Sequence, residues 1–139
     1  MKPIRVILAE DHPEMAQQLQ ALLDCRYDVD VVCDGQALIA AADLEPPDLI
    51  ISDIAMPGIS GLAAARHILK LYPEALIIFA TVLDEPAIIR RALAEGARGY
   101  VMKSDAGDEL ADAVDTVLAG GQYVSSSARA ALGGRPRSN

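Results

Sequence analysis

The sequence predicts a doubly wound α/β fold, in which a five-stranded parallel sheet with the strand order 2-1-3-4-5 lies between two layers of helices. Three observations lead to this prediction. Short apolar runs alternate about five times with longer amphipathic stretches along the 139 residues. The apolar runs are continuous in Ile, Val and Leu, which is typical of strands covered on both faces. Apolar residues make up 52% of the chain, enough for one sizeable core.

The expected strands are short and rich in branched aliphatic side chains, and they cover residues 5–9, 29–33, 49–52, 76–80 and 99–102. The first helix begins at Pro13, a favourable first-turn residue after the capping group Asp11, and runs to about residue 24. The other helices cover residues 36–42, 62–71, 85–95 and 107–118. In the last of them Leu110, Val114 and Val117 recur at helical spacing, which predicts a buried face.

The chain changes character after Gly121, where QYVSSSARAALGGRPRSN is small, polar and basic. We therefore expect one domain over residues 1–121, followed over 122–139 by a linker or a short extra helix with a loose end. The 18 residues after Gly121 are too few for a helix-turn-helix module, so none is expected in this chain.

Charge and composition argue against several classes of function. Twelve basic against twenty acidic side chains give a net charge of −8, which disfavours this chain as the part that grips nucleic acid. Neither a secretory signal nor an apolar stretch of membrane-spanning length is evident, so we expect a soluble, cytoplasmic protein with no membrane partner. Cys25 and Cys33 belong to no CxxC pair, and we interpret both as small core or surface residues.

Unusual polar residues end four of the five expected strands; they are Glu10, Asp11, Asp53, Thr81 and Lys103. In the stretch LIISDIAMPG the bare carboxylate of Asp53 follows a buried strand, which is unfavourable unless something pairs with it. The carboxyl ends of parallel strands form the edge where open α/β sheets bind ligands. Because the first and third strands are neighbours in the predicted order, Glu10, Asp11 and Asp53 should converge there.

Three crowded carboxylates repel one another unless one is protonated or all share a cation. Oxygen ligands at this density suit Mg2+, and beside that ion a carboxylate can attack a phosphoryl group in line. Lys103 would bring a mobile positive charge to a phosphoryl oxygen, and Thr81 a hydroxyl donor. Asp53 is therefore better explained as an acyl-phosphate nucleophile than as a cap.

Each residue also has an ordinary structural explanation. Taken singly, an aspartate such as Asp53 before a turn is usually a turn or cap residue, and an acidic pair such as Glu10-Asp11 is most often a helix cap. A threonine or lysine at a strand end is ordinarily packing or solvated surface. Together, on four strands and one edge, these explanations become improbable. His12, beside the acid pair, is interpreted as a loop residue without a catalytic role.

Four pieces of sequence, ILAEDHP, LIISDIAMPGISG, IIFAT and GYVMKSD, follow one another over residues 4 to 120. In combination they resemble a response-regulator receiver domain of bacterial two-component signalling, a flavodoxin-like or CheY-like three-layer sandwich. The resemblance implies that a sensor histidine kinase phosphorylates Asp53. It also implies that Glu10, Asp11 and Asp53 hold Mg2+ together with the backbone carbonyl of Ala55.

The same resemblance makes Thr81 the switch hydroxyl, Lys103 the phosphate-pairing lysine and Tyr100 the aromatic that moves inward on activation. Such a protein is a phosphorylation-dependent switch that catalyses only its own phosphorylation and dephosphorylation. The face made by helix 85–95, the fifth strand and the fifth helix would then change to control an output domain or dimerisation.

The DHP after Glu10 and the stretch GARGYVMKSDAGDELADAVDTVLAGGQYVS resemble one branch, the NarL/FixJ receivers with LuxR-type output domains. This branch implies a transcription regulator that forms a homodimer on activation. It would contact DNA only through an output domain that is absent from this chain. The alternative is a single-domain or unphosphorylated receiver that acts as a protein-interaction module.

Two enzymatic or binding functions compete with this interpretation. A Mg2+-dependent phosphatase of the haloacid-dehalogenase kind normally carries a second aspartate two residues after its nucleophile, where this chain has Ala55. A nucleotide or flavin module needs a glycine-rich loop after the first strand, where EDHPEM stands instead.

Since Ala55 and Leu83 are apolar and cannot orient a water towards the phosphoryl group, we expect a comparatively long-lived phosphorylated state.

Overall fold

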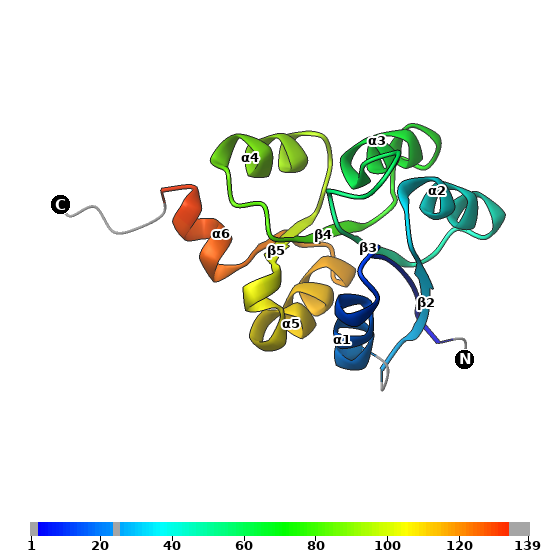
Figure 1. Cartoon of the computed structure of the whole chain (residues 1–139), viewed down its shortest axis with the longest axis horizontal. Helices are drawn as coiled ribbons and strands as arrows, with labels where there is room; N and C mark the ends of the chain where they lie inside the picture. The colour runs from blue at the N-terminus through cyan, green and yellow to red at the C-terminus, as the bar shows by residue number, and fades with distance from the viewer. Residues whose placement is uncertain (1–2, 24–25, 134–139) are drawn as a thin grey trace.

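The computed structural model describes residues 3–23 and 26–133 (Figure 1). In this part of the chain, six strands form one sheet in the order β2-β1-β3-β4-β5-β6, and every neighbouring pair is parallel. The strands are β1 (Arg5–Ala9), β2 (Asp28–Val32), β3 (Leu49–Ser52), β4 (Ile77–Thr81), β5 (Gly99–Met102) and β6 (Tyr123–Val124). The predicted α/β class is confirmed, whereas the predicted count of five strands is wrong.

Helices cover both faces of the sheet (Figure 1). On one face lie α1 (Pro13–Leu23) and α5 (Ala106–Leu118), and on the other lie α2 (Gly35–Leu44), α3 (Gly61–Leu71) and α4 (Pro86–Ala94). A one-turn 3-10 helix, η1 (Lys103–Asp105), joins β5 to α5, and a short α6 (Ser126–Ala131) follows β6. The strands β1 to β5 and the helices α1 to α5 begin and end within two residues of the expected bounds.

Local sequence explains where the helices begin and which faces they bury. The side chains of Asp34 and Ser60 accept hydrogen bonds from the third residue of α2 and α3, at 2.7 Å and 3.1 Å. On α5 the predicted apolar positions Leu110, Val114 and Val117 are fully buried. Each face of the sheet therefore has its own apolar core, one beneath α1 and α5 and one beneath α2, α3 and α4.

The sixth strand is the correction to the sequence-based fold. β6 lies along the outer edge of β5, where the N–H of Tyr123 donates to the carbonyl of Arg98 and the N–H of Ser125 to that of Tyr100, both at 2.9 Å. A two-residue strand has no periodicity to detect, so only its tertiary pairing reveals it. Of the two alternatives expected after Gly121, a linker or a short extra helix, the described residues contain a short helix, α6.

Two expectations fall on or beside the gaps in the described residues. The expected end of the first helix at residue 24, together with Cys25, lies outside the described residues. Cys33 is an exposed free cysteine directly after β2. Among the described helices, none is long and apolar enough to cross a membrane.

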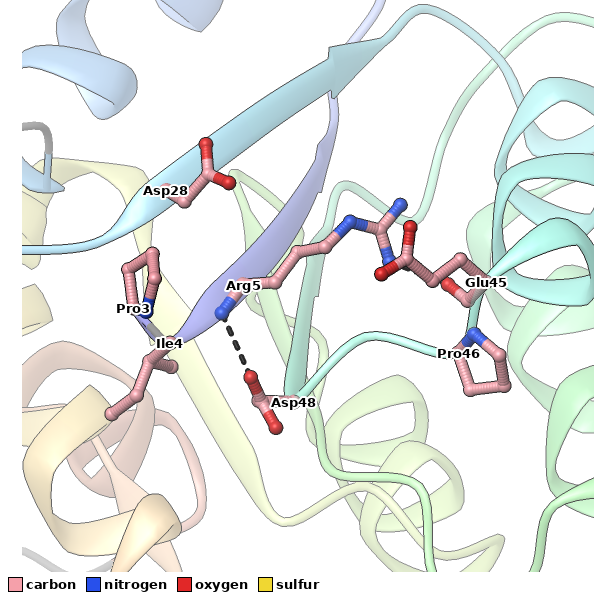
Figure 2. A pocket seen from close by; sticks show the side chains of 7 residues that line it. All are labelled: Pro3, Ile4, Arg5, Asp28, Glu45, Pro46 and Asp48. Atoms are coloured by element: carbon pink, nitrogen blue, oxygen red, sulfur yellow. Dashed lines mark hydrogen bonds between the residues drawn. The ribbon is translucent and has the colours of Figure 1, made fainter. Parts of the chain in front are cut away.

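A hollow of about 360 Å3 lies where β1 and β2 begin, at the edge of the sheet opposite the predicted site (Figure 2). The backbone N–H of Arg5 donates to Asp48 Oδ2 at 2.8 Å, and the guanidinium of Arg5 pairs with Asp30 at 3.2 Å. These polar groups tie β1 to β2 and to the segment before β3. We therefore interpret this edge as structural.

Candidate functional site

The sheet register brings the carboxylates of two neighbouring strands together. Ala9 of β1 lies opposite Ser52 of β3, and the N–H of Asp53 donates to the carbonyl of Ala9 at 2.9 Å. The residues that follow, Glu10 and Asp53, therefore leave the sheet side by side. Both are almost completely buried, with 2% and 5% of their surface exposed.

Tight loop geometry holds Asp53 in place. Its Oδ1 accepts a hydrogen bond from the N–H of Ile54 at 2.7 Å, and its carbonyl accepts one from the hydroxyl of Ser52 at 2.7 Å. The first residue of α3, Gly61, approaches so closely that an added Cβ would overlap the carbonyl oxygen of Asp53. Only glycine allows this contact, so the glycine in LIISDIAMPGISG closes the loop around the carboxylate.

Lys103 bridges the two buried carboxylates. Its Nζ lies 2.7 Å from Oε1 of Glu10 and 3.0 Å from Oδ2 of Asp53, and only 7% of its side chain is exposed. Burial lowers the pKa of Lys103, but the two carboxylates outweigh that effect and the pKa lies above its ordinary value. The ammonium therefore stays charged and offsets part of the repulsion between Glu10 and Asp53.

Two carboxylate oxygens keep unused bonding capacity. Oε1 of Glu10 has only the ion pair with Lys103 at 2.7 Å, and the nearest group to Oδ1 of Asp11 is the ring nitrogen of His12 at 3.3 Å. Among the described residues these are the only buried side-chain nitrogen or oxygen atoms without a hydrogen-bond partner. A carboxylate oxygen has more than one acceptor site, so each of these oxygens can accept a further ligand.

These oxygens belong to a cluster that can hold a cation. Glu10, Asp11, His12 and Asp53 each offer one ligand atom, and these atoms lie within 4.8 Å of one another. A set of three carboxylates fits a hard divalent ion such as Mg2+, and the two oxygens with spare acceptor capacity fit the same occupant.

His12 takes a larger part in this cluster than the sequence indicated. Its ring Nδ1 lies 3.1 Å from Oε2 of Glu10 and 3.3 Å from Oδ1 of Asp11, and its backbone N–H donates to the same Glu10 oxygen at 3.1 Å. The ring itself is 71% exposed. His12 thus orients the carboxylate of Glu10 from the solvent side.

Thr81 ends β4, Tyr100 lies in β5, and both residues are fully buried. Both contact the backbone of Leu83: its N–H donates to Oγ1 of Thr81 at 3.2 Å, and its carbonyl accepts the hydroxyl of Tyr100 at 2.6 Å. Burial, followed by the charges of Glu85 and Asp53, raises the pKa of Tyr100 far above its usual value, so the ring stays neutral. The structure brings Thr81 and Tyr100 to one loop, and within the described residues no hydrogen bond joins Thr81 to Asp53.

The carboxylates open into a shallow hollow of about 360 Å3. Its walls include the predicted residues Asp53, Ala55 and Lys103, and also Met15 of α1 and Val82, which sequence reasoning missed. Val82 is an apolar residue with 67% of its surface exposed, directly after Thr81. An apolar residue at the end of a buried strand gives no sign of its exposure in the sequence.

Comparison with known proteins identifies the family of the chain. The family model described as "Response regulator receiver domain" matches residues 6–115. The transcriptional regulatory protein DegU of Brevibacillus brevis is 30% identical over 124 residues, which cover 87% of this chain and 52% of DegU. A LuxR-family two-component response regulator from Aurantimonas superimposes with a TM-score of 0.86 at 29% identity, covering 96% of this chain and 97% of that one.

A structure of the RcsB response regulator of Salmonella typhimurium matches with a TM-score of 0.84 at 28% identity, covering 96% of this chain and 68% of that chain. The chain spans 52% to 63% of the length of the first curated relatives. These relatives are therefore longer than the stretch that they share with this protein.

Proposed function

This chain belongs to the family of response regulator receiver domains, in the LuxR-type group, and from that premise we propose that Asp53 accepts a phosphoryl group from a sensor histidine kinase. The observation that carries the proposal is the buried Asp53 carboxylate beside Lys103 and the cation cluster. The Lys103 ammonium lies 3.0 Å from the Asp53 carboxylate and can stabilise negative charge on a transferred group. The carboxylate also borders an open hollow, through which a phosphodonor can reach it.

Mg2+ would be held by carboxylates of Glu10, Asp11 and Asp53, with the backbone carbonyl of Ala55 as a further ligand. Bound there, the ion offsets negative charge on the phosphoryl oxygens. Glu10 and Asp11 contribute the oxygens that lack hydrogen-bond donors. Ala55 lies on the wall of the same hollow, as this role requires.

In the transfer step an oxygen of Asp53 forms a bond to phosphorus while the bond from phosphorus to the donor's imidazole nitrogen breaks. The electron pair of the broken bond leaves with the imidazole. Lys103 turns its ammonium from the carboxylates towards a phosphoryl oxygen, since it is the nearest cation. Thr81 then donates its hydroxyl to another phosphoryl oxygen, which pulls the loop at Leu83 inward.

The buried Tyr100 hydroxyl is bonded to that loop, so the switch would reach β5 and α4 through Leu83. The surface formed by α4, β5 and α5 would change with it and control an output domain or dimer formation. RcsB, one of the similar proteins, is described in complex with promoter DNA. For the present chain, DNA contact through an output domain, homodimer formation and a cytoplasmic location remain part of the proposal.

A protein-interaction module that is never phosphorylated is the second candidate. The cluster of carboxylates around Lys103 favours a phosphoacceptor over this alternative, because a surface used only for binding needs no buried carboxylate cluster.

The test is the intact mass of the protein after incubation with Mg2+ and acetyl phosphate. The wild type should gain one phosphoryl group, and Asp53→Asn should gain none. A gain in both would place the acceptor elsewhere. No gain with acetyl phosphate, nor with other small phosphodonors, would favour the interaction module.

A further inference from the structure

We propose that residues 122–132, which contain β6 and α6, form a latch that holds the Lys103-bearing turn in its unphosphorylated position and is released when Asp53 is phosphorylated. Ser125 of the latch and Asp105 of the turn are positioning residues, because both act on Lys103 through the backbone. The inference rests on the proposed phosphoacceptor function and adds to it the segment that reports the state of Asp53.

The latch occupies part of the surface that the sequence assigned to signalling. β6 fills the outer edge of β5, so the carbonyls of Arg98 and Tyr100 already have partners within the same chain. Ala128 of α6 is fully buried in the apolar core that also contains Tyr100. Figure 1 shows α6 beside the β5 end of the sheet, where it contacts β5 and η1.

The first attachment lies one residue before Lys103. Ser125 is fully buried, and its Oγ accepts a hydrogen bond from the N–H of Met102 at 3.0 Å. The latch is therefore bonded to the backbone that carries the lysine. Because both groups are buried, separating them would leave a polar group unsatisfied until water enters.

The second attachment lies two residues after Lys103. Asp105 ends η1, and its two carboxylate oxygens accept the N–H and the hydroxyl of Ser127 at 2.9 Å and 2.8 Å. One turn further on, Glu109 accepts the hydroxyl of Tyr123 at 2.7 Å and the N–H of Ser126 at 3.1 Å. The turn around Lys103 is thus held by the latch on both sides.

Phosphorylation should disturb these attachments. Lys103 now reaches Glu10 and Asp53 together, whereas a phosphoryl group would place the negative oxygens beyond the carboxylate. The ammonium must follow, and it belongs to a three-residue turn that ends in Asp105. Hydrogen bonds weaken steeply when their geometry is disturbed, so the bonds to Ser127 are expected to break more often.

Amide hydrogen exchange of the full chain, with and without Mg2+ and the phosphate mimic beryllofluoride, tests the latch. We expect the amides of Ser126 and Ser127 to exchange roughly two- to tenfold faster with beryllofluoride, the change that follows from loss of about one hydrogen bond. The amide of Ile50, bonded to Leu76 in the centre of the sheet, should not change. Fluorine NMR reports independently whether beryllofluoride binds.

The variant Asp105→Ala removes both bonds to Ser127. It should show fast exchange without beryllofluoride and, because coupling between two equilibria is reciprocal, should bind beryllofluoride more tightly than the wild type. A damaged fold alone would not increase that affinity. Asp108→Asn is the matched control, since Asp108 is exposed on the same helix turn, and it should behave as the wild type.

The outcomes separate the two proposals. If beryllofluoride binds but the exchange of Ser126 and Ser127 stays constant or slows, the latch is overturned and the phosphoacceptor function stands. If beryllofluoride does not bind, the phosphoacceptor function fails and the latch fails with it. Equal affinities of Asp105→Ala and wild type for beryllofluoride would also overturn the latch.

Discussion

Two groups of carboxylates lie close to Lys103 in space or in sequence, and they differ in how their oxygens are used. Glu10 and Asp53 are buried, face the cation Lys103, and belong to the cluster in which two oxygens accept no hydrogen bond. Asp105 and Glu109 are only partly buried, and neutral donors of residues 123–127 occupy their oxygens. The first group has the arrangement that the proposed function requires, whereas the second already holds its partners within the chain.

The pKa shifts follow the same division. At Asp105 and Glu109 burial alone would raise the pKa, but the hydrogen bonds from Ser125, Ser127 and Tyr123 lower it below its usual value. Burial and the bond to Glu109 raise the pKa of Tyr123 to about 12. Asp105 and Glu109, whose charged forms are stabilised by neutral donors, therefore form a structural clamp on residues 123–127. Crowded carboxylates that share one lysine are, in contrast, typical of a functional site.

The largest difference between the two groups is expected on removing the shared cation. Lys103→Met leaves Glu10 and Asp53 buried without a counter-charge, which should lower the free energy of unfolding by about 3–5 kcal/mol. Urea unfolding in EDTA measures this loss. Added Mg2+ should stabilise the variant more than the wild type, because the ion would replace the missing positive charge.

The control for this experiment is Lys70→Met, which alters an exposed lysine of α3. It should change stability by less than about 0.5 kcal/mol. Equal losses in the two variants would mean that the ion pairs of Lys103 contribute no more than a surface charge.

A pair of glycine substitutions extends the comparison to the backbone. Gly61→Ala would drive a methyl group into the carbonyl of Asp53 and should destabilise the protein by about 1–3 kcal/mol, with reduced phosphorylation. Gly107→Ala lies in open space at the start of α5 and should be neutral or stabilising by up to about 1 kcal/mol. Thermal unfolding measures both. A tolerated Gly61→Ala would show that the loop around Asp53 can relax.

Most of the fold and of the acidic cluster could be predicted, because both depend on short local patterns. Continuous apolar runs gave β1, β3 and β5 at their observed bounds, and the strand order then placed Glu10 beside Asp53. The pairing of β6 could not be predicted in the same way. Tyr123 and Val124 carry no strand pattern, and their position depends on the free edge of β5.

The contacts of individual side chains also could not be predicted from the sequence. The contact of His12 with Glu10, the exposure of Val82 and the bonds of Leu83 to Thr81 and Tyr100 all depend on the direction of a loop backbone. Loop direction is set by packing rather than by the types of residue present. The sequence therefore predicted which strand ends meet and missed how the loops between them close.

The apolar wall of the functional site permits a kinetic prediction. Ala55 lines the hollow at Asp53, and an asparagine there could orient a water towards the phosphoryl group, so Ala55→Asn should shorten the phosphorylated lifetime several-fold. Leu83 does not line this hollow. Its backbone N–H and carbonyl are bonded to Thr81 and Tyr100 instead. Leu83→Glu is therefore expected to have the smaller effect. Loss of the phosphoryl group over time, followed by mass, ranks the two, and an unchanged lifetime in Ala55→Asn would contradict the role of the wall.

The smallest effect is expected from titrating the clamp. The ordinary pKa values of aspartate and glutamate are about 4, and the folded-state pKa values of Asp105 and Glu109 lie below them. The hydrogen bonds of these two carboxylates therefore stabilise the latch above about pH 4. This contribution is lost as the pH falls through the lowered values. Amide spectra between pH 7 and 3 should show Ser126 and Ser127 changing before Ile50 in the sheet. Glu109→Gln should remove part of this acid response and leave the part due to Asp105; a simultaneous change at all three amides would mean that the clamp has no titration of its own and that the whole domain unfolds together.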